Sequence, residues 1–389
     1  MKRVYLVAGK RTPIGTFLGG LSKTSATDLS AIATKAAMEQ IKLNPDLIDD
    51  IYLGCVIQAG LGQNPARQAA LAAGIPVSVP NTLINKVCAS GMKTIMIGSQ
   101  SISVGQNHTV LAGGFECMSQ APFLVKGVRG GLPFGNQQFI DSLATDGLTD
   151  PYNSCAMGVC GEKTADAMGI TRELQDAYAI MSYERALAAA KAGRFNDEIT
   201  PVTPAKGNPV TEDEEPKKFN REKMPSLRPA FSKTGTITAA NASKLNDGAC
   251  SVFIMSEEGM KRAGVTEPLA EIVAYADAEV NPIDFNIAPE KAARLALKRA
   301  GLQVSDVDFW EFNEAFSVTG IANMKLLDIA HDKINVNGGA VAMGHPIGMS
   351  GARITLTLAN ILKQNKGKYG VASICNGGGG ASAIVLRRP

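Results

Sequence analysis

Residues 85–93 read Asn-Lys-Val-Cys-Ala-Ser-Gly-Met-Lys, and the rest of the chain is organised around this stretch. An apolar run meets a turn of small residues there, and apolar side chains then recur at helical spacing, which predicts a helix that begins just behind Cys88. Unpaired amides and the positive end of the helix dipole favour a thiolate, so we expect a lowered pKa for Cys88 and a nucleophilic thiol. A buried structural cysteine is the alternative, since most free cysteines have that role.

The bulk composition excludes several classes of protein. A chain of 389 residues is too long for one ordinary core and indicates two domains or a large fused α/β unit. With 45% apolar residues the chain reads as compact and globular, and we expect no membrane partner because no apolar run is long enough for a span. The net charge of +3 argues against nucleic acid as the main partner, while a local basic patch is compatible with acidic small molecules.

The cysteines and histidines indicate a reducing compartment. Seven cysteines are scattered along the chain without a CxxC motif, which is typical of reduced thiols. There are three histidines, and Cys155 and Cys160 lack the usual ligand spacing, so we expect no zinc site. The start of the sequence resembles neither a signal peptide nor an arginine-rich leader. We therefore expect the cytoplasm, with the mitochondrial matrix, after removal of a leader, as the alternative.

Strand and helix patterns alternate in the first part of the chain and predict a parallel sheet covered on both faces. In order, they are strand Val4–Ala8, turn Gly9–Pro13, helix Thr27–Gln40, strand Ile51–Val56, helix Asn64–Ala73, the Cys88 corner and strand His108–Ala112. From Ser119 to about Ser243, glycine and proline multiply and charges cluster, with an acidic run at 212–215 and a basic run at 217–223. We interpret this segment as an insertion that carries binding loops, although charge runs are often only a solvated face.

The second half of the chain repeats the first with an offset of about 260 residues. Leu43–Leu53 resembles Leu302–Phe312, and the Ser-Gly helix start at Ser90 recurs at Ser350. A strand that ends in glycines also recurs, before Gly377. The repeat predicts a duplicated α/β domain, divided into a first half (1–118), an inserted loop domain (119–248) and a second half (249–389). Packing of the halves is expected to bring both Ser-Gly helix starts to one centre.

Three further motifs are expected to meet Cys88 at that centre: residues 313–316 (Asn-Glu-Ala-Phe), 344–346 (Gly-His-Pro) and 375–377 (Cys-Asn-Gly). His345 lies among small residues that leave it open to a ligand, so it is the candidate base for Cys88. Cys375 precedes four glycines, whose amides can approach a developing oxyanion. Two cysteines and one histidine suit acyl capture and proton transfer better than disulfide exchange, because a CxxC motif is missing.

These motifs, together with residues 241–249 (Asn-Ala-Ser-x-Leu-Asn-Asp-Gly-Ala), make the chain resemble the thiolase family over essentially its whole length, most of all the biosynthetic acetyl-CoA C-acetyltransferase type. The resemblance implies a five-layered αβαβα fold with an inserted loop domain. It implies that Cys88 takes an acetyl group from acetyl-CoA as a thioester while His345 accepts the thiol proton. Cys375 would then remove the α-proton of a second acetyl-CoA, which gives acetoacetyl-CoA. Asn313 would hold a water at one oxyanion site, and the amides of Cys88 and Gly377 would form the other.

The resemblance also implies binding sites. Coenzyme A is expected as substrate and product, with no covalently bound cofactor, and as the chemical partner in the form of acyl-CoA. Its contacts would be Met157, Tyr183, Lys218, Phe219, Asn220, Lys223 and Ser243. The potassium-activated members of the family imply a potassium site at Tyr183, Ala239, Ala240, Ala242 and Val341. The family further implies a homo-oligomer, a dimer of dimers.

Two departures from the family pattern bear on the acyl group. The insertion has Ala156 before Met157 where biosynthetic thiolases have histidine, and Asn286 follows Phe285 where the potassium-activated type has proline. These departures leave open a degradative 3-ketoacyl-CoA thiolase with a broader or 2-methyl-branched acyl range. A non-catalytic scaffold that binds coenzyme A is an alternative of another class, and a thiol-disulfide exchanger is the weakest.

Overall fold

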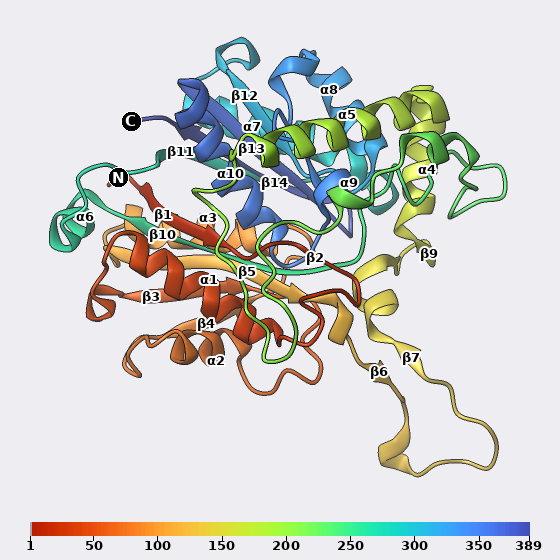
Figure 1. The fold of residues 1–389 in the computed structure, drawn as a ribbon, viewed down its shortest axis with the longest axis horizontal. Helices are drawn as coiled ribbons and strands as arrows, with labels where there is room; N and C mark the ends of the chain where they lie inside the picture. The colour runs from red at the N-terminus through yellow and green to blue at the C-terminus, as the bar shows by residue number, and fades with distance from the viewer. Residues whose placement is uncertain (1) are drawn as a thin grey trace.

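A ten-stranded β-sheet, made of two halves with a matching strand order, dominates the computed structural model, which describes residues 2–389 (Figure 1). The two halves are called the first and the second sheet. The first sheet contains, in spatial order, β4 (Asn81–Ile84), β3 (Asp50–Gly54), β5 (Thr109–Cys117), β10 (Asn246–Met255) and β1 (Tyr5–Arg11), with β2 (Gly15–Thr16) beside β10. The second contains β12 (Phe309–Phe312), β13 (Tyr369–Asn376), β14 (Gly380–Arg387) and β11 (Ala270–Glu279). The sheets join where Tyr5 and Leu6 of β1 pair with Glu271 and Ala270 of β11.

Helices form three layers around and between the sheets, as the predicted five-layered fold requires (Figure 1). The outer helices are α1 (Ala26–Gln40) and α2 (Pro65–Ala72) on the first sheet, and α7 (Ala288–Ala300) and α8 (Ser317–Leu327) on the second. The central helices are α3 (Ser90–Ser103) and α10 (Ser350–Asn365). The predicted duplication is confirmed, since each half has the same order of strands and helices, and the bridge of Ile334 to Trp310 lies where β4 pairs with β3.

The sheets are mixed, so the expectation of a parallel sheet is wrong in part. Pairing is parallel for β3 with β4, β3 with β5 and β12 with β13, which are the strands joined by crossover helices. The other pairs are antiparallel, because β10 and β14 each return directly beside the preceding strand of the sheet. Strand β1 also extends through the predicted turn to Arg11, since its neighbour β10 pairs along that length.

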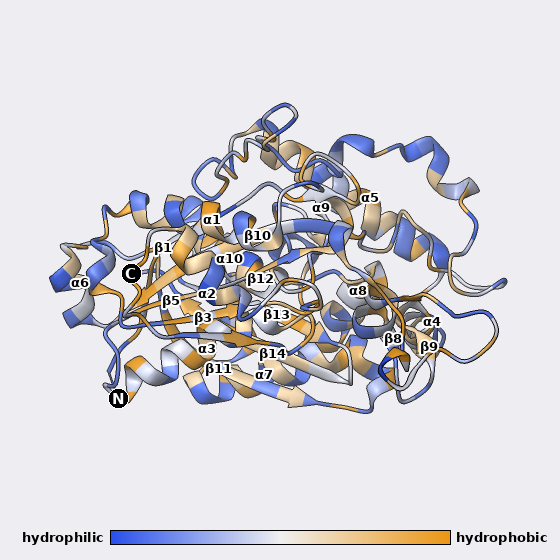
Figure 2. Ribbon diagram, turned by 90° about the horizontal axis from the view of Figure 1, so that it is seen from below, coloured by the Kyte–Doolittle hydropathy of each residue, from blue (hydrophilic) through white to orange (hydrophobic). Residues whose placement is uncertain are grey.

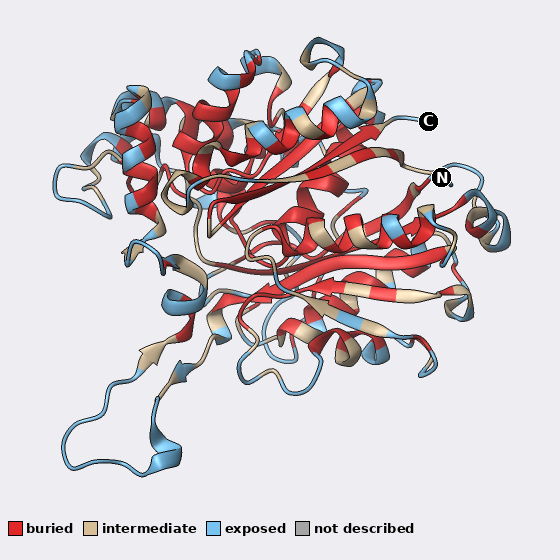
Figure 3. Cartoon of the chain, turned by 180° about the vertical axis from the view of Figure 1, so that it is seen from behind, coloured by how far each residue is buried: buried red, intermediate tan, exposed pale blue. Residues whose placement is uncertain are grey.

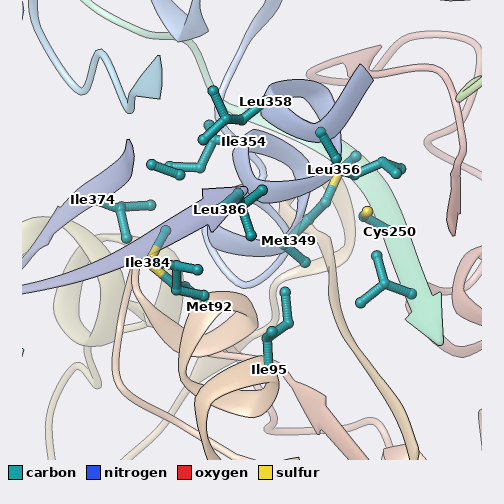
Figure 4. Packing of buried hydrophobic residues seen from close by; sticks show 14 of the residues in the cluster. Met92, Ile95, Cys250, Met349, Ile354, Leu356, Leu358, Ile374, Ile384 and Leu386 are labelled. Carbon is teal, nitrogen blue, oxygen red and sulfur yellow. The ribbon is translucent and has the colours of Figure 1, made fainter. Parts of the chain in front are cut away.

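The central layer contains a large cluster of buried apolar side chains, some of which Figure 4 shows. Residues of α3 such as Met92 and Ile95 face Met349 and Ile354 from the start of α10 and strand residues from both sheets. The helices cross where each has a glycine: a Cβ on Gly351 would lie 2.5 Å from Met92 N, and one on Gly91 would lie 2.9 Å from Ala352 N. Both Ser-Gly helix starts therefore meet at one centre, as predicted.

The inserted segment leaves the first sheet at the end of β5 and returns at β10. Its elements are β6 (Phe123–Leu124), β7 (Ile140–Asp141), β8 (Thr149–Asp150), β9 (Cys155–Ala156), α4 (Met157–Met168), α5 (Arg172–Lys191) and the 3-10 turns Pro216–Lys218 and Arg221–Ser226. The β6–β7 hairpin projects from the body, and its tip is exposed (Figure 3). The predicted junction at residue 248 falls inside β10, a strand of the first sheet, so we propose the boundary between the halves after α6 (Glu257–Ala263) instead.

Local sequence signals explain where the helices begin and end. The Ser25 hydroxyl accepts a hydrogen bond from Asp28 N at the start of α1, and Thr171 does the same for α5. Gly301 ends α7 in the left-handed conformation. Polar residues lie mainly on the outer helices and loops, and apolar residues on the inner strands (Figure 2). Among residues 2–389, no helix has both the length and the apolar character to cross a bilayer.

Candidate active site

Cys88 lies on the short corner between β4 and α3, directly before the helix N-cap Ala89. Val87 adopts a positive φ of 47°, which turns the chain sharply into the helix, and Ser90 Oγ accepts a hydrogen bond from Lys86 N at 2.9 Å. The Cys88 side chain is half-buried and packs beside a small apolar cluster that includes Ile347. The sequence therefore predicts the position of this thiol correctly.

The expected low pKa of Cys88 is wrong. Burial raises the pKa of the thiol to about 11, and the nearby Glu116 carboxylate adds to the rise. The backbone N–H groups of Gly377 and of Cys88 itself lower the pKa, but desolvation outweighs them. Both amides thus face the Cys88 sulfur, and the resting group is a thiol that needs a base to become a nucleophile.

Cys375 lies near the end of β13, in the half of the molecule opposite to Cys88. Its side chain is buried in an apolar cluster with Phe285 and Phe316, and this burial raises its pKa well above the ordinary value. The nearby Cys88 side chain contributes a further rise in this pKa. Gly377 follows on the turn into β14, where a Cβ would lie 3.6 Å from Val87 Cγ1 and 3.8 Å from Met157 Cε.

His345 is buried, and its protonation is defined by its neighbours. Ser350 Oγ donates to Pro346 O at 3.0 Å, so it accepts from His345 Nδ1 at 2.6 Å. Nε2 consequently carries the lone pair and accepts from Asn313 Nδ2 at 3.4 Å. Burial and the Arg353 guanidinium lower the pKa of His345 to about 3, so the imidazole is neutral near pH 7. Asn313 Oδ1 is buried without a hydrogen-bond partner within the described chain.

Residues that sequence reasoning did not single out hold the loop of residues 344–348, which carries the candidate base His345 and is called the catalytic loop below. Asn246 Oδ1 accepts a hydrogen bond from His345 N at 2.9 Å, and a Cβ on Gly344 would lie 2.3 Å from that oxygen. Glu116 Oε2 accepts from Gly348 N at 3.0 Å, which joins β5 to the loop before α10. Asn246 stood inside a quoted motif, whereas no local pattern marks Glu116, because its partners are amides far away in the chain.

Glu314 is buried next to Asn313 and binds together three segments. Its carboxylate accepts hydrogen bonds from Tyr178 OH, Ser182 Oγ, Asn335 Nδ2 and Val341 N. Four donors compensate for the burial of the charge and attach α5 to α9 (Ala340–Met343), the helical turn that leads into His345. Glu314 thus positions the catalytic loop.

The residues predicted to contact the nucleotide end of coenzyme A lie around one cavity of about 230 Å³. It is lined by Tyr183, Glu215, Lys218, Phe219, Asn220, Lys223, Met224, Leu227, Ala239, Ala240 and Lys244. Phe219 stacks on Tyr183 with ring centroids 4.7 Å apart and an interplanar angle of 10°. The other two predicted contacts lie towards the thiols: Met157 beside Gly377, and Ser243 with its N–H bonded to Ala315 O at 2.9 Å.

A lysine ammonium lies among the residues predicted to bind potassium. Lys244 Nζ donates to Tyr183 OH at 2.5 Å, Val341 O at 2.7 Å and Ala242 O at 2.9 Å. Ala239 and Ala240 line the adjacent cavity. Lys244 occupies the position left variable in the quoted motif, so the sequence pattern gave no reason to select it.

The two departures from the family pattern lie in different surroundings. Asn286 is buried, accepts from Thr319 Oγ1 at 2.6 Å and donates to Thr164 Oγ1 at 3.3 Å, so its side chain joins α8 to α4. Ala156 is the exposed N-cap residue of α4, directly before Met157. Ala156 is therefore exposed beside Met157, whereas Asn286 lies in the interior and is hydrogen-bonded between two helices.

Cys155 and Cys160 also approach each other, with their sulfurs 3.8 Å apart and an oxygen of Asp150 nearby. The Asp150 carboxylate already accepts hydrogen bonds from Tyr152 N and Asn153 Nδ2. Three ligand atoms fall short of the four of a structural zinc site, so the cluster does not change the expectation for zinc.

Opposite halves of the duplicated fold thus supply two thiols, a neutral imidazole and an array of amides as the candidate active site. The chain belongs to the thiolase family, a class of acyltransferases. The family model for the thiolase N-terminal domain matches residues 4–258, and the family model for the thiolase C-terminal domain matches residues 266–388. The family assignment covers both halves and the insertion.

Individual relatives are similar over the full length. A probable acetyl-CoA acetyltransferase of Dictyostelium discoideum is 54% identical over 392 residues, which cover 100% of this chain and 94% of that protein. The human mitochondrial acetyl-CoA acetyltransferase is 52% identical over 393 residues, covering 100% of this chain and 91% of that protein. The crystal structure of the Acat5 thiolase from Ascaris suum in complex with coenzyme A is 47% identical with a TM-score of 0.95, and the match covers 100% of both chains.

Proposed function

We propose that this protein is an acetyl-CoA C-acetyltransferase that joins two molecules of acetyl-CoA into acetoacetyl-CoA and coenzyme A, and that also catalyses the reverse thiolysis. The observation that carries the proposal is that Cys88 and Cys375 come from opposite halves and meet at one site, since the turn that follows Cys375 lies against the Cys88 corner, with a Cβ on Gly377 3.6 Å from Val87 Cγ1. The names of the relatives at 50–54% identity support acetyl-CoA as the substrate.

In the first half-reaction, Cys88 sulfur attacks the carbonyl carbon of acetyl-CoA. The Cys88 proton moves to His345 Nε2, which carries the free lone pair. The N–H groups of Cys88 and Gly377 stabilise the oxyanion, since both already face the sulfur. Coenzyme A leaves as a thiol with the proton of Cys375, so the site then holds an acetyl thioester, an imidazolium and a Cys375 thiolate.

In the second half-reaction, the Cys375 thiolate removes an α-proton from a second acetyl-CoA. Its raised pKa makes it a strong base once the leaving coenzyme A has taken its proton. The carbanion attacks the acetyl group, a carbon–carbon bond forms, and the Cys88 thiolate leaves and regains its proton from His345. The imidazolium N–H of His345 donates to the enolate oxygen, and the buried, unpartnered Asn313 Oδ1 accepts from a water that donates to the same oxygen.

Coenzyme A binding is assigned to the cavity beside the Phe219–Tyr183 stack. Lys218 and Lys223 place positive charge there for the phosphates, although Lys218 also donates to Thr16 Oγ1 at 2.7 Å. The Ascaris thiolase with bound coenzyme A supports a site of this kind, since the two folds match over their whole length.

Mass spectrometry after mixing with acetyl-CoA tests the covalent step. We expect a mass gain of about 42 Da, acetyl in place of the thiol hydrogen, confined to the peptide that contains Cys88. The Cys375→Ser variant keeps this adduct but loses condensation, and Cys88→Ser loses the adduct and about a thousandfold or more in kcat. An adduct on Cys375 alone, or none at all, contradicts the proposal and leaves a scaffold that binds coenzyme A.

The acyl range is tested by thiolysis of acetoacetyl-CoA, its 2-methyl derivative and a six-carbon homologue. The human mitochondrial 3-ketoacyl-CoA thiolase has the same shape, with a TM-score of 0.96, but a lower identity of 41%. We expect the four-carbon substrate to give the highest kcat/KM. A strong preference for the longer chain assigns the degradative class instead.

We also propose a homo-oligomer, a dimer of dimers. Strand β4 is an edge strand that pairs only with β3, and the β6–β7 hairpin exposes aromatic side chains, two features that proteins usually cover. For the compartment, the mitochondrial names of several relatives favour the matrix over the cytoplasm.

A further inference from the structure

Lys244 places a positive charge where three segments of the chain converge. Its ammonium donates one hydrogen bond each to α5, through Tyr183 OH, to the chain before β10, through Ala242 O, and to α9, through Val341 O. The Nζ atom also lies 4.9 Å from the centre of the Tyr183 ring. An ammonium has three protons, so these three acceptors satisfy it completely.

The residues do not fit a free potassium ion. Three of the five groups expected as potassium ligands accept hydrogen bonds from the Lys244 ammonium. A second monovalent cation beside them would share those oxygens with a like charge at contact distance, which is unfavourable. The chain thus provides a cation of its own at this place.

We propose that Lys244 is a tethered monovalent cation, a positioning residue that links the coenzyme A pocket to the catalytic loop, so that the enzyme works without potassium. The inference rests on the proposed function and names the group that positions its substrate. The ammonium replaces the ion and costs no binding entropy at each turnover, because it is covalently attached.

The link runs through contacts on both sides of the ammonium. On the pocket side, Lys244 contacts the Tyr183 ring, which stacks on Phe219. Loss of the ammonium is therefore expected to let these two rings, which line the cavity, move. On the catalytic side, Val341 is held at its carbonyl by Lys244 and at its N–H by Glu314, and His345 follows four residues later. Loss of Lys244 is therefore expected to weaken coenzyme A binding more than it slows the chemical step.

The charge of Lys244 is set by groups on every element around it. Burial lowers its pKa to about 8, while Glu215 and Glu314 act in the opposite direction, and Lys218 and Lys223 line the same cavity. The ammonium is charged below that pH and loses one of its three protons above it.

The decisive experiment compares wild-type enzyme with Lys244→Gly in potassium-free buffer and with added potassium chloride, using thiolysis of acetoacetyl-CoA. Wild-type kinetics are expected to be indifferent to potassium. In the variant, the KM for coenzyme A is expected to rise about tenfold, with a smaller change in kcat, as for the loss of one or two hydrogen bonds. Potassium or ammonium should restore most of this loss, and tetramethylammonium should not, because it is too large for the three oxygens.

Lys261→Met is the matched control, since Lys261 is exposed on α6, and its kinetics should stay at the wild-type level with or without potassium. If Lys244→Gly does not fold, the wild-type enzyme still decides, because activation of the wild type by potassium overturns the proposal. An unchanged KM in a folded variant overturns it as well. The acetyl adduct on Cys88 is measured in parallel, so a failure of the acetyltransferase function is recognised separately.

Discussion

At the scale of single residues, the hydrogen bond between His345 Nδ1 and Ser350 Oγ decides which nitrogen can accept a proton. Ser350→Ala removes this acceptor, so the imidazole loses its fixed tautomer and orientation while the buried site stays apolar. We expect kcat to fall about 10–100-fold, the usual effect of losing a group that orients a catalytic ligand, with little change in KM. Steady-state kinetics measure the split.

Ser350→Thr is the companion variant, because it keeps the hydroxyl and should retain most of the activity. If Ser350→Ala changes KM and leaves kcat intact, Ser350 serves in substrate binding, and the tautomer argument is wrong.

The sequence indicates candidate catalytic residues more readily than their properties. Cys88, His345 and Cys375 are the candidates because each lies in a short motif at a strand end or helix start. The pKa of Cys88 was predicted with the wrong sign, because the helix N-terminus is visible in the sequence while the side chains that desolvate the thiol come from distant segments. Lys244 was missed for a related reason: its three acceptors lie on segments that only the fold brings together.

At the scale of elements, the contact between α3 and α10 depends on the absence of side chains at the crossing. A Cβ on Gly351 would lie 2.5 Å from Met92 N, a backbone atom that cannot swing away. Gly351→Ala is therefore expected to destabilise the protein by about 1–3 kcal/mol, even though alanine favours helices by about 1 kcal/mol. Chemical denaturation with urea measures the difference.

Gly130→Ala is the control for this prediction, because a Cβ at Gly130 meets no atom within 4 Å and its stability should be unchanged. Equal stability of the Gly351 variant and the wild type would show that the central helices can separate without cost.

Element types were predicted well where hydrophobic periodicity is strong, and strand directions were not. The helix predicted at Thr27–Gln40 is α1, and the one at Asn64–Ala73 is α2 with Asn64 as its cap. Strand direction depends on whether the chain crosses over or turns back, and the long insertion before β10 concealed that β10 returns antiparallel beside β5. Periodicity contains no information on that choice.

At the scale of the whole molecule, the exposed aromatic residues of the β6–β7 hairpin bear on assembly. Phe134 and Phe139 are 109% and 73% exposed, although such side chains normally avoid water. We expect the wild type to form a tetramer and the Phe134→Asp, Phe139→Asp double variant to form a smaller species with its fold intact. Light scattering coupled to size-exclusion chromatography measures the mass.

Val77→Asp is the control for assembly, since Val77 is 77% exposed outside the hairpin. A wild-type mass equal to one chain contradicts the proposed oligomer, and an unchanged mass in the double variant excludes the hairpin as its contact.

The overall architecture was predictable because it is repeated. Motifs that recur at a constant interval constrain each other, so the duplicated halves and the meeting of their helix starts followed from the sequence and agree with the structure. The boundary between the halves was not evident from the sequence, because the whole insertion lies between β10 and the preceding strands of its sheet.

The two ends of that insertion are anchored side by side, since Cys117 at the end of β5 stands opposite Asp247 at the start of β10. A segment held by neighbouring antiparallel strands can be exchanged without moving the frame that holds it. The chain is therefore modular: grafting the loops of a relative between these two anchor points should transfer acyl selectivity as a cassette, while the duplicated scaffold continues to supply the reaction chemistry.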